Sequence, residues 1–169
     1  MQRATTILRF RLLIILILSS TFVSYAEDDI KGVVTKVIDG NTIEVRSSDE
    51  TYKILLHGID SPDPGQHYAE QAKTMLEKML LKKHVMIVMH GKDRYGNRIG
   101  EIRLDDASDP RKELVAEGLA WISEKEPIQE LELLQEQARV KGKGLWGEEN
   151  PTPPWIFRRQ QTMMSQKSS

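Results

Sequence analysis

Few side chains in this sequence can do chemistry by residue type alone. The 169-residue chain has no cysteine, which excludes a disulfide framework, a thiolate zinc site, a cysteine nucleophile and a lipidated cysteine. Three of its four histidines, His67, His84 and His90, have no metal-ligand spacing, so we expect them to be surface or packing residues. The 24 Lys and Arg nearly balance the 25 Asp and Glu, which argues against a strongly basic surface for nucleic acid or membranes.

Four short motifs are informative when they are taken together and in order. They are Val-Ile-Asp-Gly-Asn-Thr at 37–42, Leu-His-Gly-Ile-Asp-Ser-Pro-Asp at 56–63, Asp-Arg-Tyr-Gly at 93–96 and Leu-Val-Ala-Glu-Gly-Leu-Ala at 114–120. With these motifs, residues 31–158 resemble the staphylococcal-nuclease-like (thermonuclease) domains. Gly-Leu-Trp at 144–146 and Pro-Pro-Trp at 153–155 look like the closing segment of the secreted bacterial members.

The resemblance implies a fold and a reaction. The fold is a five-stranded OB-type barrel with three helices. The reaction is Ca²⁺-dependent, endonucleolytic hydrolysis of phosphodiesters in DNA and RNA. In the family, two Asp carboxylates and a loop carbonyl hold the metal, a Glu positions or deprotonates the attacking water, and two Arg neutralise the phosphate. Fixed cations matter because the transition state gathers negative charge on the phosphate oxygens.

Matched position by position, the metal and base side of this site is altered. The first metal Asp is Asn41 here, which keeps an oxygen but removes one unit of attraction for Ca²⁺. Asp60 retains the second metal carboxylate, and Ser61 offers the carbonyl. The family Glu becomes Asp63, which is one methylene shorter and so moves the carboxylate by about 1.5 Å. We therefore expect weakened Ca²⁺ binding and a poorly placed base.

Both phosphate arginines are also replaced. The first falls on Leu55, five residues before Asp60, and the second falls on Asn97. Lys53 and His57 share a strand face with Leu55 and are candidate substitutes, although His57 is also explained as a half-exposed barrel histidine. A catalytic Arg on a phosphoryl group is worth about 10³–10⁵ in rate, so we predict little or no nuclease activity.

The remaining candidate ligand-binding residues are few. Tyr95 and Tyr68 are available for stacking, and Asp93 belongs to the same turn motif as Tyr95. We expect weak nucleic-acid binding, because the nearly neutral chain offers little electrostatic attraction to phosphates. Three hypotheses follow. The first is a binding pseudoenzyme that holds a protein or small ligand in its cleft. The second is a weak Ca²⁺-dependent nuclease that uses Asp60 with a substitute cation. The third is a structural module of the cell envelope.

The elements that must position these residues follow from hydrophobic periodicity and turn signals. Strands are expected at 31–38, 42–46, 51–57, 84–90 and 97–104, and helices at 67–81, 111–118 and 128–141. Residues 58–65 read as a loop because they hold two prolines and two glycines. The pattern predicts an α+β fold rich in β-structure, in which a five-stranded OB-fold barrel is flanked by three α-helices.

The two ends of the chain lie outside this predicted domain of residues 27–150. Residues 1–26 read as a signal peptide with three arginines, an apolar run at 12–18 and cleavage after Ala26, although a retained anchor is the alternative. Cleavage leaves a chain with a formal charge of −4, which we expect to be secreted or periplasmic and monomeric, without a stable membrane span. Residues 151–169 are expected to be a tail that packs Trp155 on the barrel as a strand and is disordered beyond Gln161.

Overall fold

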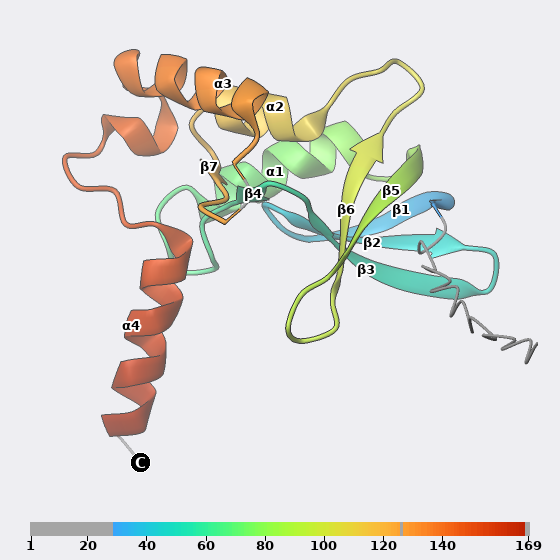
Figure 1. Ribbon diagram of the computed structural model, residues 1–169, viewed down its shortest axis with the longest axis horizontal. Coiled ribbons are helices and arrows are strands. Elements are labelled where there is room, and N and C mark those ends of the chain that lie inside the picture. Colours follow the sequence, from blue (N-terminus) through green and yellow to red (C-terminus); the bar gives the residue numbers. More distant parts are fainter. Residues whose placement is uncertain (1–28, 126, 168–169) are drawn as a thin grey trace, which may run out of the picture.

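The computed structural model describes residues 29–125 and 127–167 (Figure 1). The strands in these residues are β1 (Ile30–Asp39), β2 (Thr42–Ser47), β3 (Glu50–Leu56), β4 (Ile59–Asp60), β5 (His84–Lys92), β6 (Arg98–Arg103) and β7 (Trp121–Ile122). The helices are α1 (Ala69–Leu80), α2 (Pro110–Ala116), α3 (Gln129–Val140), a 3₁₀ turn η1 (Gly144–Gly147) and α4 (Pro154–Lys167). The predicted signal peptide at 1–26 lies outside the described residues.

Five of the strands close into a barrel in the order β1-β2-β3-β6-β5. All neighbours are antiparallel except β3 and β6, which run parallel. Side chains alternate across each strand, so Ile54 and Leu56 are buried in the barrel while Leu55 between them is only half-buried. This closed barrel with flanking helices confirms the fold class that the sequence predicts.

A β-bulge in β5 sets the position of His90. Met89 pairs with Gly100 and Gly91 pairs with Ile99, which leaves His90 as the extra residue of β5. The partner strand β6 contributes no extra residue at Gly100. A Cβ on Gly100 would lie 2.4 Å from Ile87 Cγ2, which explains a glycine at this place.

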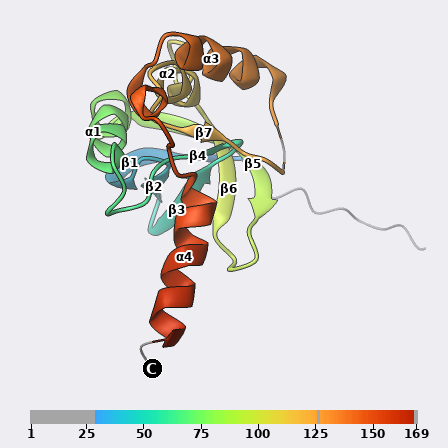
Figure 2. The same cartoon turned by 90° about the vertical axis from the view of Figure 1, so that its left-hand side faces the viewer.

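The helices α1, α2 and α3 pack together beside one end of the barrel (Figures 1 and 2). One face of α1 is buried, as its periodicity predicts, and it consists of Ala69, Ala72, Leu76 and Leu80. Strand β4 pairs with β7, which joins Asp60 to Trp121 across the sheet. The sequence assigned residues 58–65 entirely to a loop. That assignment was wrong for Ile59 and Asp60, because two residues suffice for this pairing.

The C-terminal segment is a helix, so the predicted strand at Trp155 and the predicted disorder beyond Gln161 were wrong. Helix α4 runs from Pro154 to Lys167, and proline suits its first position because an N–H is not needed there. Trp155 packs its ring edge on Trp121, with the centroids 5.7 Å apart. Beyond this first turn α4 projects away from the barrel in both views (Figures 1 and 2). Within the described residues, none of the helices combines the length and apolar character that a membrane crossing requires.

Candidate active site

The turn between β1 and β2 packs directly on the loop that follows β4. The Ser61 hydroxyl donates to the Gly40 carbonyl at 3.0 Å, and a Cβ on Gly40 would lie 2.7 Å from Ser61 Cβ. Glycine is therefore required at position 40. The Leu56 N–H donates to the Asn41 carbonyl at 2.8 Å. These contacts bring the turn that carries Asn41 to the segment that carries Asp60 and Asp63.

A guanidinium from the far end of the chain lies between the two carboxylates of this loop. Arg158 of α4 donates from Nη2 to Asp60 Oδ2 at 2.6 Å and from Nη1 to Asp60 Oδ1 at 3.2 Å. Its Nη1 also donates to Asp63 Oδ2 at 2.9 Å. The Arg158–Asp60 contact is bidentate, which is the strong geometry for this pair. The sequence did not predict Arg158 as a site residue.

Burial and the arginine act on these carboxylates in opposite directions. Burial raises the pKa of Asp60, and Arg158 offsets only part of that effect. The pKa of Asp63 is raised for the same reason, and Asp39 nearby raises both pKa values further. The pKa of Arg158 is itself raised, chiefly by its hydrogen bond to Asp60. Because burial disfavours the charged form of a carboxylate, a cation held between Asp60 and Asp63 stabilises their ionised form.

The loop and the C-terminal segment are held together by further contacts. The Gln66 side chain accepts from the Asp63 N–H at 2.9 Å and donates to the Thr152 carbonyl at 2.8 Å. The His67 ring lies 2.5 Å from a Glu148 carboxylate oxygen. These contacts position residues 148–157 across the loop and so deliver Arg158 to Asp60.

No cation stands at the two positions where the family has phosphate arginines. Leu55 pairs with Thr42 on β2 and with Ile99 on β6. Asn97 donates its side-chain amide to Asp93 Oδ2 at 2.8 Å, and the other Asp93 oxygen accepts the Asn97 N–H at 2.9 Å. The β5–β6 turn thus uses Asn97 as a structural partner of Asp93.

The predicted ligand-binding side chains have local contacts of their own. Asp93 accepts the Tyr95 N–H at 2.8 Å, and the Tyr95 ring is 74% exposed, with the Arg94 guanidinium 4.7 Å from its centroid. Tyr68 precedes α1 with a φ of 66°, and its ring centroid lies 4.4 Å from that of His67. The exposed Tyr95 ring is accessible for stacking.

Of the two predicted substitute cations, Lys53 lies on β3 and His57 follows its last residue. The His57 ring stacks on His90, with the centroids 3.8 Å apart, and Lys53 is exposed. Arg98 covers the Tyr52 ring at 4.6 Å. Tyr52 is on the opposite face of β3 from Leu55, so Arg98 points away from that position.

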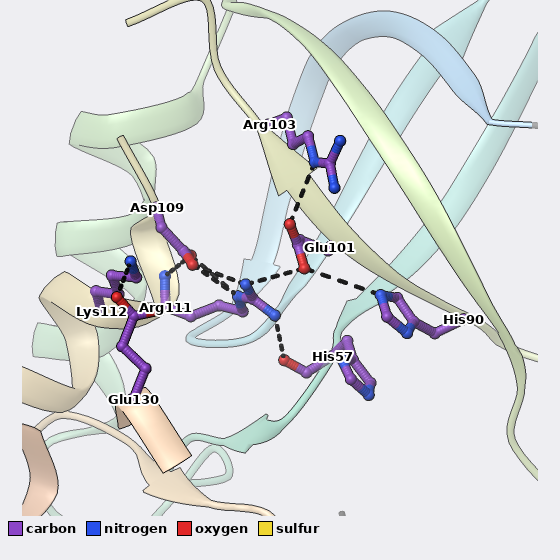
Figure 3. A network of polar contacts seen from close by, with 8 residues as sticks. All are labelled: His57, His90, Glu101, Arg103, Asp109, Arg111, Lys112 and Glu130. Carbon is purple, nitrogen blue, oxygen red and sulfur yellow. Dashed lines mark hydrogen bonds and ion pairs between the residues drawn. The ribbon is translucent and has the colours of Figure 1, made fainter. Parts of the chain in front are cut away.

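Next to His57, Arg111 forms a second charged cluster that the sequence did not predict (Figure 3). Its guanidinium lies 2.7 Å from Asp109 and 3.2 Å from Glu101, and it donates to the His57 carbonyl at 3.3 Å. Asp109 also caps α2 by accepting the Arg111 N–H. An Asp before Pro-Arg is a helix-start signal, but only the fold brings Glu101 and His57 to it.

The Asp60–Asp63 site does not fit a calcium ion as the side chains stand. Ca²⁺ takes six to eight oxygen ligands, mostly from carboxylates. Both oxygens of Asp60 accept from Arg158, and the first family Asp is Asn41. Among the residues that the structure describes, no group of three or more His, Asp or Glu is placed to hold a metal ion. Arg158 takes the cationic place between the carboxylates.

A closed five-stranded barrel with helices beside one end is an OB-like α+β domain. Residues 53–148 match the family model for staphylococcal nuclease homologues, and the chain belongs to this family. An "Uncharacterized endonuclease" of Escherichia coli O157:H7 is 36% identical over 133 residues, which cover 77% of this chain and 86% of that protein. A "Micrococcal nuclease" of Shigella flexneri is 28% identical over 142 residues, which cover 78% and 82%.

Proposed function

We propose that this protein is an exported member of the nuclease family that lacks efficient phosphodiesterase activity and acts as a binding protein. Its cleft has Leu55 and Asn97 where the family neutralises the phosphate, Asn41 in place of a metal carboxylate, and the shorter Asp63 in place of the Glu. Removing one preorganised charge stabiliser costs about 10²–10³ in rate, and the losses accumulate even when they are not additive.

The observation that carries this proposal is the pairing of Arg158 with both Asp60 and Asp63. A phosphate needs a guanidinium whose N–H groups point at its oxygens. In this cleft the Arg158 N–H groups are directed at the protein's own carboxylates. One positive charge thus faces two carboxylates of the protein itself, so the Arg158 guanidinium is not directed at a phosphate.

The ligand of the cleft is a protein or small molecule rather than a polynucleotide. The predicted formal charge of −4 after leader removal works against polyanion binding, because phosphate neutralisation dominates nucleic-acid affinity. Export is inferred from the basic, apolar and small-residue pattern of residues 1–26.

A weak Ca²⁺-dependent nuclease is the second candidate. Its substitute cation would be Arg158 rather than His57 or Lys53, because Arg158 lies beside Asp60. The Arg158 side chain is 49% exposed, so it can turn from Asp60 towards an incoming phosphate. The relatives named as endonucleases also support this candidate.

A nuclease assay separates the two candidates. The purified protein is incubated with single-stranded DNA and RNA in Ca²⁺ or in chelator, beside an active thermonuclease as the rate reference. We expect chelator-sensitive cleavage to be more than about a thousandfold slower than the reference. Cleavage within about a hundredfold would instead establish the weak nuclease.

A restored variant tests whether only the chemistry has been lost. Asn41→Asp, Leu55→Arg, Asp63→Glu and Asn97→Arg are combined, with and without Arg158→Gln. We expect Ca²⁺-dependent cleavage to appear in the restored protein and to increase when Arg158 is removed. A restored protein that folds, binds Ca²⁺ and remains inactive would contradict the view that these positions explain the loss. Retention on a nucleic-acid column at physiological salt tests polynucleotide binding separately.

A further inference from the structure

The C-terminal helix presents a cation to the cleft from outside the barrel. Arg158 lies 98 residues from Asp60 in sequence, and its guanidinium makes three hydrogen bonds to the carboxylates of Asp60, at the end of β4, and Asp63, in the loop that follows. A charged side chain on the first turns of α4 therefore occupies the space between Asp60 and Asp63.

We propose that α4 is a latch, in which Arg158 fills the cation place between Asp60 and Asp63 and so excludes divalent metal ions from these two carboxylates. The inference deepens the proposed function and rests on it, because it names the group that occupies the cleft. The group bound by Asp60 and Asp63 is the guanidinium of Arg158, which belongs to the same chain.

The geometry supports competition rather than coexistence. A divalent ion would need the same Asp60 oxygens that accept from Arg158 Nη1 and Nη2. The planar fork of an arginine matches a carboxylate in two parallel hydrogen bonds, which a lysine cannot reproduce. Bringing a metal ion and Arg158 to Asp60 together would also place like charges at contact distance.

The attachment of α4 makes this contact releasable. Pro154 is its one buried residue among those described, and Trp155 and Phe157 are half-buried. From Arg158 to Lys167 the helix is exposed, including Met163 and Met164 at 50% and 63%. An ion pair whose arginine is half-exposed contributes little to stability and is screened by salt. A competing cation can therefore displace it without unfolding the barrel.

Calcium titration of the full protein tests the latch directly. Isothermal titration calorimetry with Ca²⁺ alone is performed on the wild type, on Arg158→Gln and on Arg159→Gln. Arg159 is the matched control, because it is the next residue on the same exposed helix and its removal changes the net charge equally. We expect Arg158→Gln to bind Ca²⁺ at least about fivefold more tightly than the wild type, and Arg159→Gln to stay within about twofold.

Two further measurements exclude other causes of such a gain. Adding Asp60→Asn to Arg158→Gln should abolish the gain, which locates the Ca²⁺ in the cleft. Hydrogen exchange of residues 158–167 should accelerate in Arg158→Gln and not in Arg159→Gln, which reports release of α4. Equal Ca²⁺ affinities of the wild type and Arg158→Gln, with both proteins folded by circular dichroism, would overturn the latch.

Failure of the latch is distinguishable from failure of the proposed function. An active wild-type nuclease would overturn the proposed function, whatever the Ca²⁺ affinities of the variants are. A wild type that is inactive, and whose Ca²⁺ affinity does not respond to Arg158→Gln, would overturn the latch alone.

Discussion

Two arginines in this molecule each bridge a pair of carboxylates, and they do so in different surroundings. Arg111 joins Asp109 and Glu101 beside the barrel, and its side chain is 7% exposed. Arg158 joins Asp60 and Asp63 at the start of α4, and its side chain is 49% exposed. The chemistry of the two clusters is the same, so the difference in burial should decide what each contributes.

The Arg111 cluster is expected to hold the structure together. Burial alone would lower the pKa of Arg111, but Asp109 and Glu101 together raise it above its ordinary value. Arg111 also donates to the His57 carbonyl, so it ties β6, α2 and the end of β3 to one another (Figure 3). The Arg158 cluster ties only the projecting helix to one loop, which suits a contact that opens.

Removing the buried arginine should give the largest effect. Arg111→Ala leaves Asp109 and Glu101 without their shared partner, so we expect a loss of about 3–5 kcal/mol in the free energy of unfolding, measured by urea denaturation. The exposed Lys112, which pairs with Glu130, is the control, and Lys112→Ala should cost less than about 1 kcal/mol. Similar losses in the two variants would remove the distinction between buried and exposed clusters.

A matched pair of carboxylates sharpens the comparison. The side chains of Glu101 and Asp63 are both 27% exposed, and each lies near an arginine. Glu101→Gln should cost about 1–3 kcal/mol in unfolding free energy, because it weakens the buried Arg111 cluster. Asp63→Asn should cost clearly less in the same urea titration. The reverse order would mean that the α4 contact supports the fold more than the Arg111 cluster does.

The Arg158 contact itself should be nearly neutral for stability. A double-mutant cycle of Arg158→Gln and Asp60→Asn is expected to give a coupling energy of about 0.2–1 kcal/mol at low salt. Because the arginine is half-exposed, the coupling should fall when thermal unfolding is repeated in 1 M salt. A coupling above about 3 kcal/mol that resists salt would place Arg158 among the structural arginines.

The smallest expected effect concerns a carboxylate that has no arginine partner in its turn. The Asn97 side-chain hydrogen bond lowers the pKa of Asp93 below its ordinary value of 3.8. A lowered folded-state pKa means that this stability is present above that ordinary value and is lost as pH falls through the folded pKa. In acid titrations below about pH 4, Asn97→Ala should therefore lose slightly less stability than the wild type. A steeper acid loss in the variant would contradict this assignment.

Local patterns in the sequence were enough to predict the barrel and most of its helices. Ile43, Val45, Ile54 and Leu56 alternate with polar or half-buried residues, and this period of two specifies which strand face is buried. The face of α1 follows from its helical spacing, and Gly118 adopts a φ of 66° after α2, a conformation that favours glycine at the end of a helix.

Only the tertiary structure brought Arg158 to Asp60, His90 onto His57, and Glu101 to Arg111. Each of these pairs depends on long-range packing or on the bulge in β5. Neither of these features produces a periodic pattern of hydrophobic residues in the sequence. The polar sequence beyond Gln161 predicted disorder. The structure shows a helix there whose residues are exposed, so no hydrophobic pattern in the sequence indicates it. The sequence by itself determined which residue types stand at the motif positions, Leu55 and Asn97 among them, since residue identity decides charge. The fold decided that Arg158 lies between Asp60 and Asp63, because that contact depends on where a distant helix docks.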